Sequence, residues 1–83
     1  MNKLHAMSTF VHICDFGSLT KAADAMDTSL PTVVRTLAAL EKHLNTRLLN
    51  RTTRKITLTE EGKSYLQRCR GILFDIDEAE LEL

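Results

Sequence analysis

Residues 17–44 read GSLTKAADAMDTSLPTVVRTLAALEKHL, and this stretch decides the fold. Ser18 and Ser29 are each followed by apolar residues at helical spacing, and a serine at such a point accepts a hydrogen bond from a free amide of the first turn. Residues 27–28 interrupt the apolar pattern between the two. Pro31 fits a first helical turn, where its missing amide proton costs little. The stretch therefore predicts a short helix, a turn and a second, longer helix.

The two helices differ in the character of their faces. The first helix has two small alanines on its inner face, which let another helix cross closely. Its inner residues are Leu19, Ala22, Ala23 and Met26. The second has an apolar inner face of Val33, Leu37, Leu40 and Leu44 and an outer side of Thr32, Arg35, Thr36 and Ala39. A helix, a short turn and a second helix that exposes small polar groups and an arginine is the arrangement that enters the major groove of DNA.

An amphipathic helix is predicted before this motif. Apolar residues recur there at steps of three and four and form one stripe: Leu4, Met7, Phe10, Val11, Ile13 and Cys14. Gly17 stands where a left-handed C-terminal cap would end the helix. The motif is therefore expected to be the second and third of three helices.

Residues 48–58 change to an alternating pattern and predict two short strands around a basic turn. Basic and hydroxyl side chains crowd this turn: Arg51, Thr52, Thr53, Arg54 and Lys55. Positive charge and hydroxyl groups suit DNA phosphates or a narrow minor groove. The other interpretation of the same residues is an ordinary solvated hairpin tip.

Residues 59–83 predict a long helix that Thr59 caps. Roughly 24 residues would span about 36 Å, which is longer than the preceding domain could cover. Apolar residues recur at alternating steps of four and three, the spacing of a coiled-coil seam: Tyr65, Cys69, Ile72, Ile76, Ala79 and Leu83. We expect a second chain to cover this seam. The alternatives are that the helix packs on its own domain or on a further domain.

Charge is divided between the two parts of the chain, although the formal net charge of the 83 residues is zero. Residues 1–58 carry eight Lys and Arg against four Asp and Glu and net +4, whereas residues 59–83 carry three against seven and net −4. The first part can meet a polyanion and the second would be repelled by one.

Other classes of function have little support in the sequence. A domain of this length leaves little room for a catalytic cleft, and there is no nucleophile elbow, Gly-rich phosphate loop or paired-carboxylate signature. Cys14 and Cys69 fall on apolar stripes without metal-ligand spacing, so we expect packing roles and no metal site. Without a secretory signal or an apolar run of membrane-spanning length, we expect a cytoplasmic protein that is not an enzyme.

Residues 16–62, FGSLTKAADAMDTSLPTVVRTLAALEKHLNTRLLNRTTRKITLTEEG, resemble the LysR-type transcriptional regulators without a gap. The most specific pieces are Gly17-Ser18 with Ala22-Ala23, Ser29-x-Pro31, Val33-x-Arg35, Leu40-Glu41, Leu48-Leu49-x-Arg51 and Leu58-Thr59-x-x-Gly62. The resemblance implies a mainly α fold. A winged helix-turn-helix of three helices and a short two-stranded wing would occupy residues 1–58, with the motif at about 18–37 and the wing at about 48–58. A linker and dimerisation helix would follow over residues 59–83.

The same resemblance implies a function. Such regulators bind double-stranded promoter DNA in a sequence-specific way as homodimers joined through the linker helix, and a tetramer is possible in the full-length protein. In this family a larger domain follows and binds a small-molecule effector. We expect that domain to lie outside these 83 residues, and we expect no cofactor within them.

Roles for single residues follow from the resemblance as well. Ser18 resembles the cap of the first motif helix, and Ser29 and Pro31 resemble the start of the recognition helix. Arg35 resembles the basic DNA contact of that helix, and Arg51 the wing arginine that reaches the backbone or the minor groove. The predicted DNA-binding set also includes neighbouring polar residues and two residues that differ from the family pattern. The set is Ser18, Thr28, Ser29, Leu30, Pro31, Thr32, Val34, Arg35, Thr36, Arg51, Thr52, Arg54 and Lys55.

Two residues depart from the family pattern. Leu30 stands where many members have Gln, and Val34 stands where many have Ser. Both changes remove polar groups that could read base edges or hold phosphates. We therefore expect sequence reading to depend more on apolar contact with thymine methyl groups, and on Arg35 and the threonines, than is usual in the family.

A protein-interaction or dimerisation module is the competing interpretation, because winged helices and heptad helices serve that role too. DNA binding would weaken steeply with salt as counterions are released from phosphates, and an interaction module would show no such dependence coupled to sequence preference.

Overall fold

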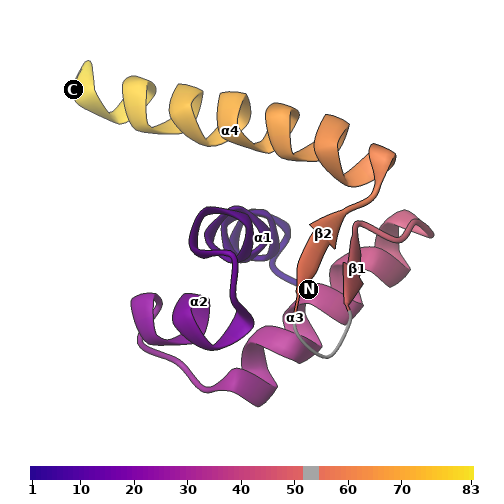
Figure 1. Ribbon diagram of the computed structural model, residues 1–83. Coiled ribbons are helices and arrows are strands. Elements are labelled where there is room, and N and C mark those ends of the chain that lie inside the picture. The colour runs from indigo at the N-terminus through magenta and orange to yellow at the C-terminus, as the bar shows by residue number, and fades with distance from the viewer. Residues whose placement is uncertain (52–54) are drawn as a thin grey trace.

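Four helices and one two-stranded sheet make up the part of the chain that the computed structural model describes, residues 1–51 and 55–83 (Figure 1). In chain order these are α1 (Lys3–Phe16), α2 (Leu19–Ala25), α3 (Leu30–Leu44), β1 (Leu49–Arg51), β2 (Ile56–Leu58) and α4 (Glu60–Leu81). The strands pair antiparallel, with Leu49 opposite Leu58 and Arg51 opposite Ile56. The predicted fold class, three helices and a short wing followed by a long helix, is confirmed.

Three helices begin, and one ends, at capping residues that the sequence indicates. The side chains of Ser18, Ser29 and Thr59 each accept a hydrogen bond from the backbone amide three residues later, at 3.1, 3.3 and 2.9 Å. Gly17 follows α1 with a φ of 65°, and its amide donates to a carbonyl of the last turn. Each cap satisfies a backbone group that the helix itself leaves without a partner.

The turn between α2 and α3 brings the two helices of the motif close together. Ala22 and Ala23 are buried, so that α2 can approach its neighbours closely. After α2, Asp27 adopts a left-handed φ of 54°, and the amide of Thr28 donates to the carbonyl oxygen of Ala23 at 2.9 Å. This tight closure directs the chain into α3 at Leu30.

The core differs from the sequence prediction at α1. The largest fully buried side chains of the described residues are Phe10, Ile13, Leu40, Leu48, Val33, Thr9 and Cys69. Leu4, predicted to lie on the same stripe, is 48% exposed, so the prediction is wrong for this residue. At 100° per residue Leu4 lies about 120° around the helix from Phe10, which places it outside the buried face.

The first half of α4 packs against α1 of the same chain. Cys69 is completely buried, and the ring of the half-buried Tyr65 lies 5.8 Å from that of Phe10, centroid to centroid. Arg70 Nη2 donates to Asp15 Oδ1 at 2.6 Å across the same contact. Cys69 therefore belongs to the core of its own chain and cannot lie at a seam with a partner. Spacings of four and three residues mark an apolar face but do not say what covers it.

The second half of α4 extends past α1 and the rest of the molecule to the C-terminus (Figure 1). Ile72 is 44% exposed there and Phe74 is 62% exposed, while Ile76 is half-buried. Of the predicted seam, Ile72, Ile76, Ala79 and Leu83 thus lie beyond the part of the helix that α1 covers most closely, and their contact with a second chain stays a prediction.

Candidate nucleic-acid interface

The first two turns of α3 carry a row of polar side chains on their outer face. Ser29 Oγ lies 2.9 Å from Thr32 Oγ1, and Arg35 Nη2 donates to Thr32 Oγ1 at 3.4 Å. Ser29 and Arg35 are exposed and Thr32 is half-buried. A guanidinium has five N–H donors, so Arg35 retains donors for an outside acceptor beyond the long bond to Thr32. The row offers hydroxyl groups and one cation to a polar, negatively charged surface.

Apolar side chains lie between these polar ones. Leu30 is 41% exposed at the first residue of α3, and Pro31 beside it is exposed as well. Val34 is half-buried. Only the first two of these therefore present much apolar surface outward.

Three other members of the predicted set have local structural roles. Ser18 is half-buried and its oxygen caps α2, while the hydroxyl of Thr36 donates to the backbone oxygen of Thr32 at 2.9 Å. Thr28 is half-buried and its amide closes the turn before α3. These three residues thus support the motif itself, and their contact with DNA stays a prediction.

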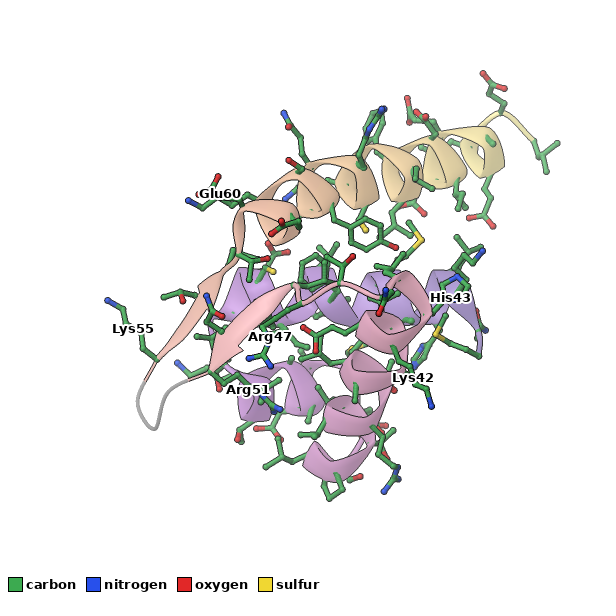
Figure 2. All side chains as sticks on the ribbon, turned by 90° about the vertical axis from the view of Figure 1, so that its right-hand side faces the viewer. Lys42, His43, Arg47, Arg51, Lys55 and Glu60 are labelled. Carbon is green, nitrogen blue, oxygen red and sulfur yellow. The ribbon has the colours of Figure 1, made fainter. Side chains whose placement is uncertain are left out.

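The wing places two cations near its tip. Arg51 ends β1 and Lys55 precedes β2, and both side chains are exposed. Figure 2 shows the two on the wing, far from Lys42 and His43 near the C-terminal end of α3. Thr52 and Arg54 of the predicted set lie outside the described residues.

Two residues near the base of the wing were not in the predicted set. Arg47 is exposed just before β1 and adds a third cation on this side of the molecule (Figure 2). Glu41, on α3, accepts hydrogen bonds at Oε2 from the backbone amides of Leu48 at 2.7 Å and Leu49 at 3.2 Å. Arg47 could have been found from the sequence, because it is a basic residue directly before the predicted wing. Glu41 could not, because no spacing rule connects a helical glutamate with amides seven and eight residues later.

The other side of the wing base is held by the start of α4. The Thr59 amide donates to the Leu48 carbonyl oxygen at 3.0 Å, and the Thr59 hydroxyl donates to the Arg47 carbonyl oxygen at 2.7 Å. A Cβ atom at Gly62 would collide with the Leu48 carbonyl oxygen, so that only glycine permits this approach. Backbone groups on both sides of Leu48 are therefore fixed by neighbouring elements.

Burial acts on the thiols of both cysteines. Burial raises the pKa of Cys14 to about 11, although the nearby Arg70 guanidinium acts in the opposite direction. Burial likewise raises the pKa of Cys69. Within residues 1–51 and 55–83, no three His, Cys, Asp or Glu side chains are grouped so that they could hold a metal ion. The helices of this part of the chain are also too short or too polar to cross a membrane.

Comparison with known proteins agrees with the geometry. The sequence model of the family described as bacterial regulatory helix-turn-helix protein, lysR family, matches residues 4–63. The chain is 49% identical over its whole length to the HTH-type transcriptional repressor PA14_22550 of Pseudomonas aeruginosa (strain UCBPP-PA14) and 40% identical to the HTH-type transcriptional activator AaeR of Escherichia coli (strain K12). It spans 26% and 27% of those two proteins.

A solved structure of a complex of the BenM DBD with benA site 1 DNA is similar in fold. The TM-score is 0.92 at 30% identity, over 95% of this chain and 89% of that one. The matched residues 4–63 run from α1 to the start of α4 and so include α3 and the two strands, which carry the candidate interface. This chain belongs to the lysR family of bacterial regulatory helix-turn-helix proteins.

Proposed function

We propose that this chain is the sequence-specific DNA-binding segment of a transcription regulator and that the first turns of α3 enter the major groove of promoter DNA. The observation that carries the proposal is the outward row of Ser29, Thr32 and Arg35 at the start of α3. Arginine in this groove donates to the two acceptors of guanine, and hydroxyl groups serve bases or phosphates. The similar fold of a protein solved with DNA supports the same placement.

The wing contacts the backbone or the minor groove in this proposal. Arg51 and Lys55 are exposed on it, and Arg47 lies at its base. Contacts of such cations with phosphates fix the register of the protein on the duplex without reading its sequence. Thr52 and Arg54 stay predicted members of this group from the sequence.

We propose that two chains bind together as a homodimer through the second half of α4. A single module of this size buries only about 600–1,000 Å² on DNA, so a second copy is needed for useful affinity. An antiparallel pairing would also bring Arg68 of each helix toward the acidic end of the other, where Asp75, Asp77, Glu78, Glu80 and Glu82 lie. Higher oligomers, up to a tetramer, belong to the full-length regulator.

Further parts of the proposal concern the longer protein. The chain spans about a quarter of the curated relatives it matches, and we propose that a small-molecule effector binds to a domain outside it. We propose no catalytic role for these residues and no cofactor within them. Because the proposed target is promoter DNA of a bacterium, we place the regulator in the cytoplasm.

The test is fluorescence anisotropy with a duplex selected from a randomised pool and a scrambled duplex of equal length, over a series of salt concentrations. We expect the selected duplex to bind more tightly, with an affinity that falls steeply as salt rises. Arg35→Ala should weaken binding to the selected duplex by about 5- to 150-fold, because a base contact of arginine contributes about 1–3 kcal/mol.

Lys63→Ala is the matched control for charge. It removes one positive charge from the first turns of α4, where Lys63 pairs with Glu60 at the surface, and it should leave the preference for the selected duplex unchanged. Equal affinity for the two duplexes, or insensitivity to Arg35→Ala, would favour the protein-interaction module over the DNA-binding segment.

A further inference from the structure

The wing is joined to α3 by a side chain. Glu41 Oε2 accepts hydrogen bonds from the amides of Leu48 and Leu49, at 2.7 and 3.2 Å. Leu48 is 1% exposed and Leu49 is 4% exposed, so their amides have little access to water as an alternative partner. Hydrogen bonds to an ionised carboxylate are shorter and stronger than those between neutral groups. The first residue of the wing is therefore fixed to the helix that carries Arg35.

The Leu48 backbone is held from its other side as well. Its carbonyl oxygen accepts the Thr59 amide at 3.0 Å, and Gly62 lies so close to that oxygen that a side chain would collide with it. The amide side of Leu48 depends on Glu41, and the carbonyl side depends on the start of α4. Because both the amide and the carbonyl group of Leu48 are held, the direction in which β1 continues from Leu48 is fixed.

The direction of β1 decides where Arg51 lies. Arg51 follows Leu48 by three residues, about 10 Å of extended chain. Glu41 follows Arg35 by six residues on α3, about 9 Å along the helix axis. Both arginines are thus placed from a common base, and the Glu41 carboxylate is the link between the helix and the strand. A rotation of β1 at Leu48 would move Arg51 and leave Arg35 in place.

We propose that Glu41 is a positioning residue for DNA binding: its carboxylate fixes the wing relative to α3, so that Arg51 meets the backbone of the same duplex whose groove Arg35 enters. The inference rests on the proposed function. It states that Glu41 supports the contribution of Arg51 to affinity and has no part in the contribution of Arg35.

The experiment is a pair of double-mutant cycles measured by anisotropy on the selected duplex at one salt concentration. Arg51→Ala and Arg35→Ala are each made in the wild type, in Glu41→Leu and in Glu41→Gln. Both Glu41 variants remove the same negative charge, but glutamine keeps a carbonyl oxygen that can accept from the two amides. The comparison of the two separates the loss of the acceptor from the change in net charge.

We expect Arg51→Ala to weaken wild-type binding by about tenfold and to have less than about a threefold effect in Glu41→Leu, because the wing is then no longer held. Arg35→Ala should weaken binding by the same factor in the wild type and in Glu41→Leu. Glu41→Gln should restore most of the effect of Arg51→Ala. Equal effects of Arg51→Ala in wild type and Glu41→Leu would overturn the inference, and so would an equal loss of the Arg35 effect.

Circular dichroism first establishes that each variant folds. If Glu41→Leu does not fold, Glu41→Ala takes its place, because the smaller side chain lets water reach the two amides. A second readout does not need DNA: amide chemical shifts of Leu48 to Arg51 should move in the variant while those of the first turns of α3 stay. Unmoved wing amides would overturn the inference, whereas moved amides without any binding of wild type to the selected duplex would refute only the proposed function.

Discussion

Leu30 is 41% exposed at the first residue of α3, beside the N-cap Ser29. An apolar side chain there cannot exchange hydrogen bonds with base edges, but it can contact the 5-methyl group of thymine in the major groove. Since burial of one methyl group contributes about 0.8 kcal/mol, such a contact is worth about a fourfold change in affinity. The preference of this chain for thymine at one position is therefore expected to depend on Leu30.

The prediction can be tested with uracil, which lacks only that methyl group. Replacing each thymine of the selected duplex by uracil in turn should weaken wild-type binding about fourfold at one position. Leu30→Gln should be insensitive to the replacement at that position, and Leu4→Gln, which changes an exposed leucine of α1, should keep the wild-type response. Wild-type indifference to every thymine methyl would contradict the idea.

The Cys14 thiol is expected to be nearly inert in the folded chain. Burial raises its pKa from the ordinary 9.0 to about 11, so its thiolate fraction at neutral pH falls by about 100-fold. Alkylation by iodoacetamide at pH 7.5 should be slower than that of an unfolded control in urea by a similar factor. Fast alkylation of the folded chain would show that Cys14 is more accessible than its burial implies.

The raised pKa of Cys14 also sets a direction for stability against pH. Below about pH 9 the thiol is protonated in both the folded and the unfolded chain, so it makes no difference there. Between about pH 9 and 11 the unfolded chain loses its proton first and is stabilised. The free energy of unfolding should therefore fall over this range, and a Cys14→Ala variant should lose less of it in urea titrations.

At the scale of elements, the two glycines of α4 should respond oppositely to alanine. A Cβ atom at Gly62 meets the Leu48 backbone, whereas one at Gly71 meets no heavy atom of the described residues within 4 Å. Gly62→Ala should lower the free energy of unfolding by about 1–3 kcal/mol through overpacking. Gly71→Ala should raise it by about 0.5–1 kcal/mol, because alanine has the higher helix propensity.

Urea denaturation monitored by circular dichroism measures both changes in the same helix. The pair controls for the general effect of alanine in α4, since only the surroundings differ. A stabilising Gly62→Ala would mean that α4 does not approach the wing as described, and a destabilising Gly71→Ala would mean that Gly71 does not face open space.

Capping residues at this scale were predictable, but the faces of the helices were only partly so. Ser18, Ser29 and Thr59 cap helices as predicted because each acts on amides three residues away, within one turn. The packing role expected for Cys69 is confirmed, but its place in the seam, like that of Leu4 on the buried face of α1, is not, since periodicity identifies an apolar face without saying which surface covers each of its residues. The sequence therefore predicted the caps, which depend on local hydrogen bonds, but not which surface packs on each helix face.

For the whole molecule, the exposed apolar residues of α4 bear on assembly. Ile72 is 44% exposed on the half of α4 that extends past α1. Ile72→Glu should raise the dimer dissociation constant by about tenfold or more, because it sets a charge into an apolar contact. Affinity for the selected duplex should fall with it, since two copies are required. Sedimentation over a range of concentrations measures the first effect and anisotropy the second.

Leu4→Glu is the matched control, because Leu4 is similarly exposed at 48% but lies on α1. It introduces the same negative charge and should leave the dimer dissociation constant unchanged. Equal effects of the two variants would indicate that the dimer does not form through α4.

The sequence by itself determined the order of the elements, four of their caps (Gly17, Ser18, Ser29 and Thr59) and the division of charge between residues 1–58 and 59–83. These features depend on neighbours within a few residues or on composition alone. It also placed Arg35 on the outer face of α3 and Arg51 on the wing, where the structure has them. Only the tertiary structure decided that Cys69 lies in the core and that Glu41 holds the wing. Both are tertiary contacts between different elements, and their geometry depends on how all the elements pack together.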